Sequence, residues 1–304
     1  MFDKVLVLTD GNDPGQPALR RALSCVAENG EIEILAVVYE PMLEGYLGNK
    51  EIYEPLRQRV LAERREGANA LARAVESQGV RAVAKAVWSH PMHAAVAAEV
   101  NANGIDLVVA APANLHQGGG AARARGLTHS DWQVVTSCPA PLLIVKSDGQ
   151  AKYRNVVAAV DPFHAHAKPA DLDRGILRLA KSLQSLAGAR LTALHCYVPI
   201  DYFGADLTRV PARDPKFVDG RREALEALCA EAGVPADAAR LVAGIPHATL
   251  QAMQQRGEAD LIVIGALARG RFAELILGNT AERVLHDGST DVLVVTPQGA
   301  VPRR

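Results

Sequence analysis

The chain has 304 residues, of which 49% are hydrophobic and 22% are charged, and its formal net charge is −1. This length is comfortable for two domains, and the composition is that of a globular protein with ample material for a core. The near-zero charge gives no electrostatic reason to expect nucleic acid as a partner, and an aromatic content of 4% leaves little surface for stacking on single strands. We find neither a signal peptide nor an apolar run of the roughly 18 to 20 residues that span a membrane. We therefore expect a cytoplasmic protein.

The cysteines are scattered and share no short metal-ligand spacing; they are Cys25, Cys138, Cys196 and Cys229. Reduced, buried thiols fit this pattern better than a disulfide framework. His164 and His166 stand close together in DPFHAHAKP, but no carboxylate or cysteine stands at a supporting spacing. We predict no metal site.

The chain contains an internal repeat with a period of about 150 residues. Four pairs of segments share this spacing: KVLVLTD with NVVAAVD (4–10 and 155–161), EIEILAVVYEP with ARLTALHCYVP (31–41 and 189–199), GIDLVVAAP with EADLIVIGA (104–112 and 258–266), and PLLIVKS with DVLVVTP (141–147 and 291–297). So long a period indicates duplicated domains rather than a solenoid. We place them at 1–148 and 151–304, with a polar linker, SDGQAKYR, at 147–154.

Each copy alternates predicted strands with predicted helices. The strand segments are short and rich in Val, Ile and Leu without polar alternation, which is typical of parallel strands covered on both faces. Apolar residues recur every three to four positions at 51–78 and at 216–232, which predicts amphipathic helices there. The sequence therefore predicts an α/β protein of two tandem doubly wound domains, each a five-stranded parallel sheet flanked by helices.

In such sheets ligands bind at the carboxyl ends of the strands, where the strand order reverses. In the second copy this directs attention to Asp161, after the first strand, and to GALARGRFAELILGNTAERV at 265–284, after the fourth. Asn279 is a good N-cap residue with Glu282 three positions later, so a helix is expected to start there. Its N-terminus would attract a phosphate.

Two other features of that segment favour an anion. Gly265 would let the backbone approach a ligand closely, and Arg269 and Arg271 add positive charge nearby. The alternative is a capped helix after an exposed loop with solvated arginines. The residues alone leave both interpretations open.

The sequence resembles the universal stress proteins in several features. These are the tandem halves, the TD and VD after the first strands, and the run Gly265-x-x-Ala268-x9-Gly278-Asn279-Thr280. THSDWQVVTSCPAPLLIVK in the first copy and LGNTAERV in the second are similar to the tandem bacterial branch known by the letter E. The resemblance covers almost the whole chain and implies the Rossmann-like fold of that family.

The resemblance also implies a site for an adenine nucleotide, ATP, in the second domain only. Asp161 would lie beside the adenosine and the backbone of Cys196 would border the adenine. Gly265 and Ala268 would line the ribose and phosphates, and the phosphates would be held by Gly278, Asn279 and Thr280. Ala268 departs from the family's second glycine and Asn279 from its hydroxyl residue, which implies a weakened or altered site.

The first copy departs further from the nucleotide-binding pattern. Pro112 stands where the second copy has Gly265, and it removes a backbone donor. Thr128 followed by Asp131 predicts a capped helix. Gly118 to Gly120 are expected to be coil rather than a phosphate loop. We predict no nucleotide in this half.

No nucleophile motif and no P-loop lysine occurs in the chain, so we predict a stress-response or regulatory binder without catalytic residues. Mg²⁺ would take part only if the nucleotide carried it. Two alternatives remain: a weak ATPase, and a binder of an apolar or lipid-like ligand in pockets between the copies. Segments 40–55 and 198–215 would line such pockets, with Tyr46, Tyr53, Tyr202 and Phe203.

The last predicted strand of each copy, PLLIVK or VLVVTP, is apolar and would be a liability as an exposed edge. Pairing the two within one chain would hide both. We therefore predict an intramolecular pseudo-dimer, with further self-association left open.

Overall fold

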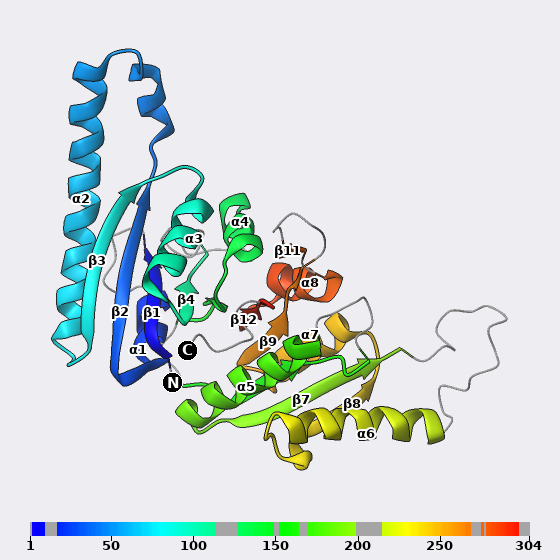
Figure 1. Ribbon diagram of the computed structural model, residues 1–304. Coiled ribbons are helices and arrows are strands. Elements are labelled where there is room, and N and C mark those ends of the chain that lie inside the picture. Colours follow the sequence, from blue (N-terminus) through cyan, green and yellow to red (C-terminus); the bar gives the residue numbers. More distant parts are fainter. Residues whose placement is uncertain are drawn as a thin grey trace. The chain divides into compact units, whose positions relative to one another are not determined.

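The computed structural model describes residues 2–9, 17–112, 127–148, 152–163, 170–198, 215–268, 275–276 and 278–297. The chain forms two compact units that divide after Ala151, here called the first and second unit (Figure 1). Both alternate strands with helices, and each contains a five-stranded parallel sheet. The predicted α/β fold with two tandem doubly wound domains is confirmed.

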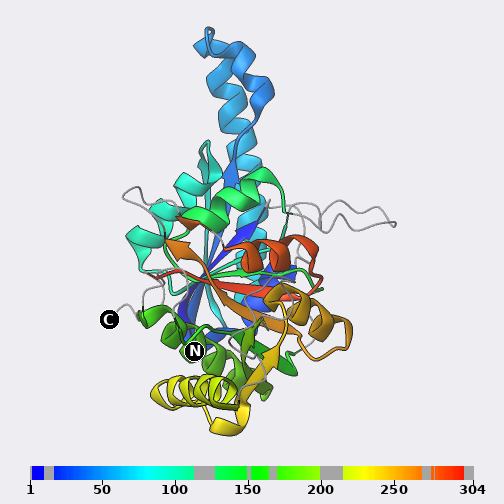
Figure 2. The same cartoon turned by 90° about the vertical axis from the view of Figure 1, so that its right-hand side faces the viewer.

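The first unit has its strands in the order β3-β2-β1-β4-β5, all parallel. Its elements are β1 (Phe2–Thr9), α1 (Pro17–Leu23), β2 (Val26–Val38), η1 (Pro41–Tyr46), α2 (Lys50–Glu76), β3 (Arg81–Trp88), α3 (Met92–Asn103), β4 (Leu107–Ala110), α4 (His129–Ser137) and β5 (Leu142–Ile144). The helix predicted at 51–78 is α2, which lies along β3. Figures 1 and 2 show η1 and the first turns of α2 reaching beyond the ends of β2 and β3.

The second unit repeats this order as β8-β7-β6-β9-β12, again parallel. Its elements are β6 (Asn155–Ala159), α5 (Ala170–Ala187), β7 (Arg190–Tyr197), α6 (Pro215–Glu231), η4 (Ala236–Ala238), β8 (Ala239–Ala243), α7 (Pro246–Gln255), β9 (Leu261–Gly265), β10 (Leu267–Ala268), β11 (Leu275–Ile276), α8 (Asn279–Asp287) and β12 (Asp291–Val295). The helix predicted at 216–232 is α6. The short antiparallel pair β10 and β11 lies inside the stretch expected to be a loop.

The same side-chain contact fixes the first strand against the fourth in both units. Asp106 Oδ2 accepts hydrogen bonds from the backbone N–H groups of Asp3 and Lys4, both at 3.0 Å. Asp260 Oδ2 accepts from Arg154 and Asn155, at 2.8 and 2.9 Å. These carboxylates satisfy donors that begin the first strand of each sheet. The duplication seen in the sequence thus extends to individual hydrogen bonds.

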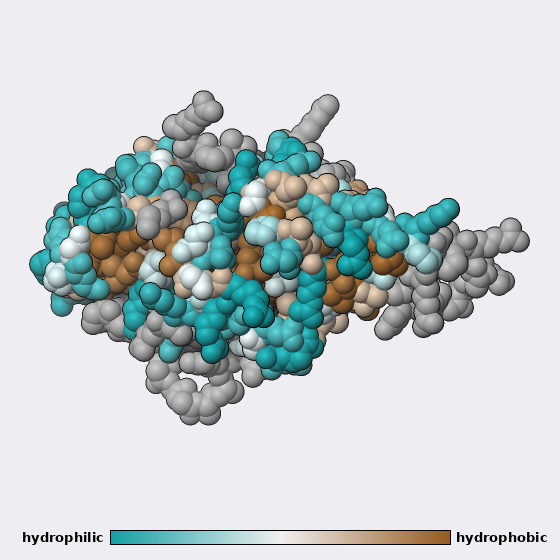
Figure 3. Space-filling model, turned by 90° about the horizontal axis from the view of Figure 1, so that it is seen from below, coloured by the Kyte–Doolittle hydropathy of each residue, from teal (hydrophilic) through white to brown (hydrophobic). Residues whose placement is uncertain are grey.

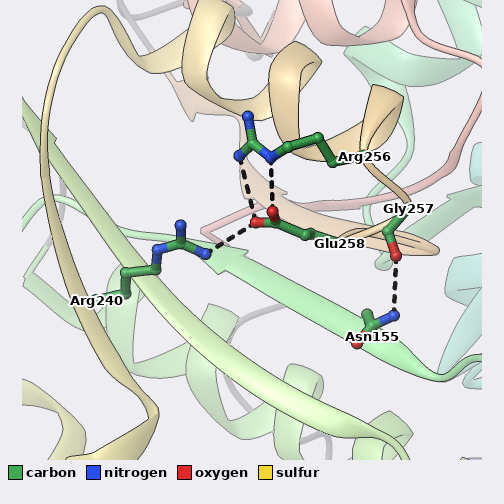
Figure 4. A network of polar contacts seen from close by, with 5 residues as sticks. All are labelled: Asn155, Arg240, Arg256, Gly257 and Glu258. Carbon is green, nitrogen blue, oxygen red and sulfur yellow. Dashed lines mark hydrogen bonds and ion pairs between the residues drawn. The ribbon is translucent and has the colours of Figure 1, made fainter.

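A second polar network holds the turn before β9 (Figure 4). Glu258 accepts hydrogen bonds from Nε of Arg256, at 2.6 Å, and from Nη1 of Arg240, at 3.0 Å. These two arginines, Arg256 first, lower the pKa of Glu258 to about 2. Nδ2 of Asn155 donates to the carbonyl of Gly257, whose φ of +69° suits glycine. The turn into the fourth strand is therefore fixed by both side chains and backbone.

The face of the molecule seen from below carries both polar and apolar residues, as the composition leads us to expect. Seen from below, hydrophilic side chains cover most of the described surface and hydrophobic ones show between them as separate areas (Figure 3). Within the described part of the chain, every helix is too short or too polar to cross a bilayer. The four cysteines carry thiols, and three of them are buried.

The intramolecular pseudo-dimer expected from pairing of the last strand of each copy, β5 and β12, stays a prediction.

Gly265 ends β9 and lies against helix α5. A Cβ atom at this position would stand 2.9 Å from Cδ2 of Leu172 and 3.1 Å from Cδ1 of Ile176. Both of these α5 side chains are completely buried and cannot move aside without repacking. Helix packing alone therefore favours glycine here, whatever ligand the site accepts.

Gly265→Ala should destabilise the second unit by about 1–3 kcal/mol, because the added methyl overpacks the contact with α5. Gly220→Ala is the matched control, since a Cβ there meets nothing within 4 Å and its place inside α6 favours alanine. We expect a lower melting temperature for the first variant and an equal or higher one for the control. Equal melting of the two variants would contradict this packing.

A buried carboxyl pair joins β2, β3 and α3 in the first unit. Glu33 Oε2 accepts from Nδ2 of Asn103 at 2.9 Å, and that amide also donates to Glu99 at 2.6 Å. Nζ of Lys85 donates to both oxygens of Glu99, at 2.8 and 2.7 Å. Burial, followed by the neighbouring Glu99 carboxylate, raises the pKa of Glu33 to about 7. Glu33 therefore stays protonated to a higher pH in the folded protein than in the unfolded chain.

This raised pKa makes stability depend on pH. The contribution of Glu33 is fully present below about pH 4.5, the ordinary pKa of an unfolded glutamate, and it is lost as pH rises to about 7. Glu33→Gln mimics the neutral carboxyl, so this variant should exceed wild type in stability at pH 8, by about 3 kcal/mol, and match it at pH 4.5. Urea unfolding at both pH values measures the difference. Glu28→Gln, on an exposed part of β2, is the control and should match the stability of wild type at both pH values. A stability difference between Glu33→Gln and wild type that does not change with pH would refute the proposed titration.

Candidate functional site

A cavity of about 450 Å³ opens at the carboxyl ends of the second unit's strands. It lies where β6 pairs with β9 and the strand order reverses, the expected place for a ligand in such a sheet. Its lining residues are Ala159, Val160, Asp161, Phe163, Leu194, His195, Cys196, Tyr197, Val198, Arg221, Pro246, Leu250, Ile264, Gly265, Gly278, Asn279, Thr280 and Ala281. The volume is in the range of pockets for small molecules.

Six of the seven residues selected from the sequence line this one cavity: Asp161, Cys196, Gly265, Gly278, Asn279 and Thr280. Ala268, the seventh, lies in β10, where it pairs with Leu275 of β11. Arg269 and Arg271 lie outside the described residues, as do His164 and His166. The tertiary structure thus brings together segments that are more than a hundred residues apart in the sequence. That they bind a nucleotide stays a prediction.

The N-terminus of α8 faces the cavity without a side-chain cap. Gly278, not Asn279, is the N-cap residue, with φ −68° and ψ 153°, and no side-chain hydrogen bond caps the helix. The predicted capping role of Asn279 was wrong. Its Oδ1 atom accepts a hydrogen bond from Nε of Arg283 at 3.0 Å instead of capping the helix. A helix end whose first N–H groups have no side-chain partner is suited to an anion.

Asp161 lies just after β6 and orders the turn that follows. Its backbone N–H donates to Oδ1 of Asp173 at 3.2 Å, and its own Oδ1 accepts from the N–H of Phe163 at 3.3 Å. The same oxygen stands 4.0 Å from Nδ1 of His195. Asp161 therefore places negative charge beside the end of β7.

His195 and Arg221 form a hydrogen-bonded pair in the cavity wall. Nη1 of Arg221 lies 3.1 Å from Nε2 of His195, and because a guanidinium can only donate, Nε2 is the acceptor. The imidazole proton is then on Nδ1, which donates to the carbonyl of Val160 at 3.2 Å. Burial is the main cause that lowers the pKa of His195, so the ring is neutral near pH 7.

Three aromatic rings surround the guanidinium of Arg221. Its Cζ atom lies 4.5 Å from the ring centre of Phe163, 4.5 Å from that of Phe217 and 5.9 Å from that of Tyr197. Distances of this size are those of cation–π contacts. We call Arg221, His195, Phe163, Tyr197 and Phe217 the Arg221 cluster.

The selection of residues from the sequence did not include the Arg221 cluster. One signal was available, because Phe217 and Arg221 are four residues apart on a predicted helix and so share a face. The partners contributed by β7 and by the turn after β6 could not be inferred from spacing. Cys196 was selected for its backbone, and burial as the main cause raises the pKa of its thiol, which makes that thiol a poor nucleophile.

The corresponding pocket of the first unit is smaller, about 190 Å³, and mostly apolar. Pro112 lines it in the place of Gly265. The helix α4 that follows carries a complete capping box: Asp131 N–H donates to Oγ1 of Thr128 at 3.2 Å, and the Thr128 N–H donates to the Asp131 carboxylate at 2.7 Å. The predicted cap is confirmed. A carboxylate already occupies this helix N-terminus, which opposes binding of a phosphate there.

Comparison with known proteins gives one consistent result along the chain. The model of the universal stress protein family matches residues 1–146 and again 152–296. Universal stress protein E of Escherichia coli K12 is 27% identical over 309 aligned residues, covering 98% of this chain and 95% of that protein. A universal stress protein from Thermus aquaticus is 33% identical over 125 residues, covering 38% of this chain and 85% of that one.

Solved structures agree in fold. A protein of unknown function from Pseudomonas aeruginosa PAO1 is similar with a TM-score of 0.70 and 22% identity, covering 98% of this chain and 94% of its own. A universal stress protein from Archaeoglobus fulgidus DSM 4304 is similar with a TM-score of 0.63 and 21% identity, covering 96% and 97%. With both halves matched by the family model and both units folded in the same way, the chain belongs to the universal stress protein family as a tandem member with two family domains.

Proposed function

We propose that the second unit binds an adenine nucleotide, ATP, in the 450 Å³ cavity and that the protein acts as a stress-response or regulatory binder rather than an enzyme. One observation carries the proposal: the N-terminus of α8, which has no side-chain cap, and six of the seven residues selected from the family pattern line the same cavity. The helix end would take the phosphates, with its N–H groups and its dipole acting together. Asp161 and the backbone at Cys196 would lie beside the nucleoside.

The contrast between the two units supports a single site. The first unit has a proline in place of Gly265, a helix N-terminus capped by its own carboxylate, and a pocket less than half as large. Mg²⁺, if it takes part, would arrive with the nucleotide. We expect one ATP per chain.

Gly278→Val should abolish ATP binding, because the added side chain fills the space where a phosphate would meet α8. The φ and ψ of Gly278 are ordinary for any residue, so the variant should still fold. Ala268→Gly should strengthen binding by relaxing the backbone of β10. Gly45→Val, in the first unit where a Cβ meets nothing, is the control.

Isothermal titration calorimetry of the full chain with Mg·ATP tests this set, with thermal melting to check folding. Absence of heat for the wild type would refute the proposal. Assaying ADP formation in the same samples tests the ATPase alternative: hydrolysis by wild type that disappears in a Gly278→Val, Asn279→Ala double variant would make the second unit an enzyme.

The apolar-ligand alternative has one observation in its favour, the first unit's pocket, whose walls include Leu8, Val37, Met92, Val134 and Ile144. Of the aromatic residues predicted to line a pocket between the copies, Tyr46 lies exposed in η1 and Tyr53 lies half-buried in α2. Tyr202 and Phe203 lie outside the described residues. Mass spectrometry of ligands released from the purified protein separates the two candidates, because a nucleotide and an apolar molecule differ in mass and extraction.

A further inference from the structure

Arg221 stands in the cavity wall although it belongs to none of the positions selected from the family pattern. It is contributed by α6, and its guanidinium is fixed by the hydrogen bond to His195 and by the rings of Phe163 and Phe217. A guanidinium fixed in this way is preorganised for recognition, because few rotamers remain to be lost on binding.

The donors of Arg221 are only partly satisfied. A guanidinium has five N–H groups, and one of them is accounted for by His195 Nε2. The Nε atom is buried and has no hydrogen-bond partner among the described residues. Aromatic faces compensate the positive charge but do not accept the remaining N–H groups in strong hydrogen bonds. A planar group with acceptors on its edge would complement both properties.

The hydrogen-bond partner of Arg221 lies on β7, whereas α8 follows β9, which is two strands away in the sheet. Gly265 ends β9, His195 and Tyr197 lie near the end of β7, and β6 runs between these two strands. Neighbouring strands are about 4.8 Å apart, so the ends of β7 and β9 are separated by about 10 Å. A nucleotide has its phosphates and its base at opposite ends, and this span suits that arrangement.

The charges at the Arg221 end favour a neutral base over a second phosphate. Asp161 stands 4.0 Å from the neutral His195, and Asp173 accepts from the backbone of Asp161. Both carboxyl groups act electrostatically on His195, the hydrogen-bond partner of Arg221, and their negative charge opposes an anion at this end of the cavity. A nucleobase carries no net charge and offers a π face and ring acceptors, so it meets no such repulsion.

Resting on the proposed function, we infer that Arg221 holds the base of the bound nucleotide, with Nη N–H groups that His195 does not accept donating to ring acceptors of the base. The Arg221 cluster then explains why the cavity would bind a nucleotide more tightly than a polyphosphate that lacks the base. His195 is a positioning residue in this arrangement, because both of its nitrogens are engaged and it acts by orienting Arg221.

The test compares ATP with inorganic tripolyphosphate, which shares the phosphates and lacks the base. Calorimetry on the full chain should show that Arg221→Ala weakens ATP binding about tenfold and leaves tripolyphosphate binding unchanged. Arg221→Lys retains the charge but not the forked N–H donors of a guanidinium, so it should also weaken ATP binding. Arg222→Ala, which removes an exposed charge from the same helix, should change neither.

The outcomes separate this inference from the proposed function. Failure of the wild type to bind ATP refutes both. ATP binding that survives unchanged in Arg221→Ala or Arg221→Lys, or an equal loss of ATP and tripolyphosphate affinity in Arg221→Ala, refutes the base contact and leaves the nucleotide site intact. Thermal melting identifies a misfolded variant, and Arg221→Lys then carries the test, since it preserves most of the side-chain packing.

Discussion

The structure of each unit depends on the pairing of its first and fourth strands. Parallel strands need crossover connections, and the direction of winding reverses where β6 meets β9, which leaves the carboxyl ends of these strands uncovered by a crossover helix. Asp260 fixes the opposite end of this pair through two backbone N–H groups. The register that results, with Ala159 opposite Ile264, brings the turn at Asp161 beside Gly265. The positions of the candidate-site residues follow from the pairing of β6 with β9.

The two units show how one backbone arrangement supports different chemistry. Asp106 repeats the contact of Asp260, so the strand pairing is the same in both. The difference arises at the helix that follows the fourth strand: α4 is closed by Thr128 and Asp131, whereas α8 begins at a glycine without a side-chain cap. The two units therefore share the hydrogen bonds that pair the first and fourth strands and differ at the terminus of the helix that follows.

Stability and binding impose overlapping demands on the cavity. The packing of α5 already favours glycine at position 265, so a glycine there is weak evidence for a ligand by itself. Arg221 presents the opposite case, because its buried Nε has no hydrogen-bond partner in the part of the chain that the structure describes, and an unpaired buried donor costs folding free energy. Residues whose presence the fold does not explain point more directly to function than those that serve both purposes.

The sequence by itself determined the duplication, the α/β class and the strand segments. The repeat can be read directly from the order of the residues, and buried parallel strands need continuous apolar runs. The resemblance to the family, together with the rule that ligands bind at the carboxyl ends of parallel strands, also selected six residues that line one cavity. Only the tertiary structure decided which residue caps α8, because Asn279 and Gly278 are adjacent and the choice depends on the contact of Asn279 with Arg283. It alone revealed the Arg221 cluster, whose members come from β7, α6 and the turn after β6. Contacts between side chains on separate elements produce no periodic pattern in a sequence. These contacts form the wall of the site.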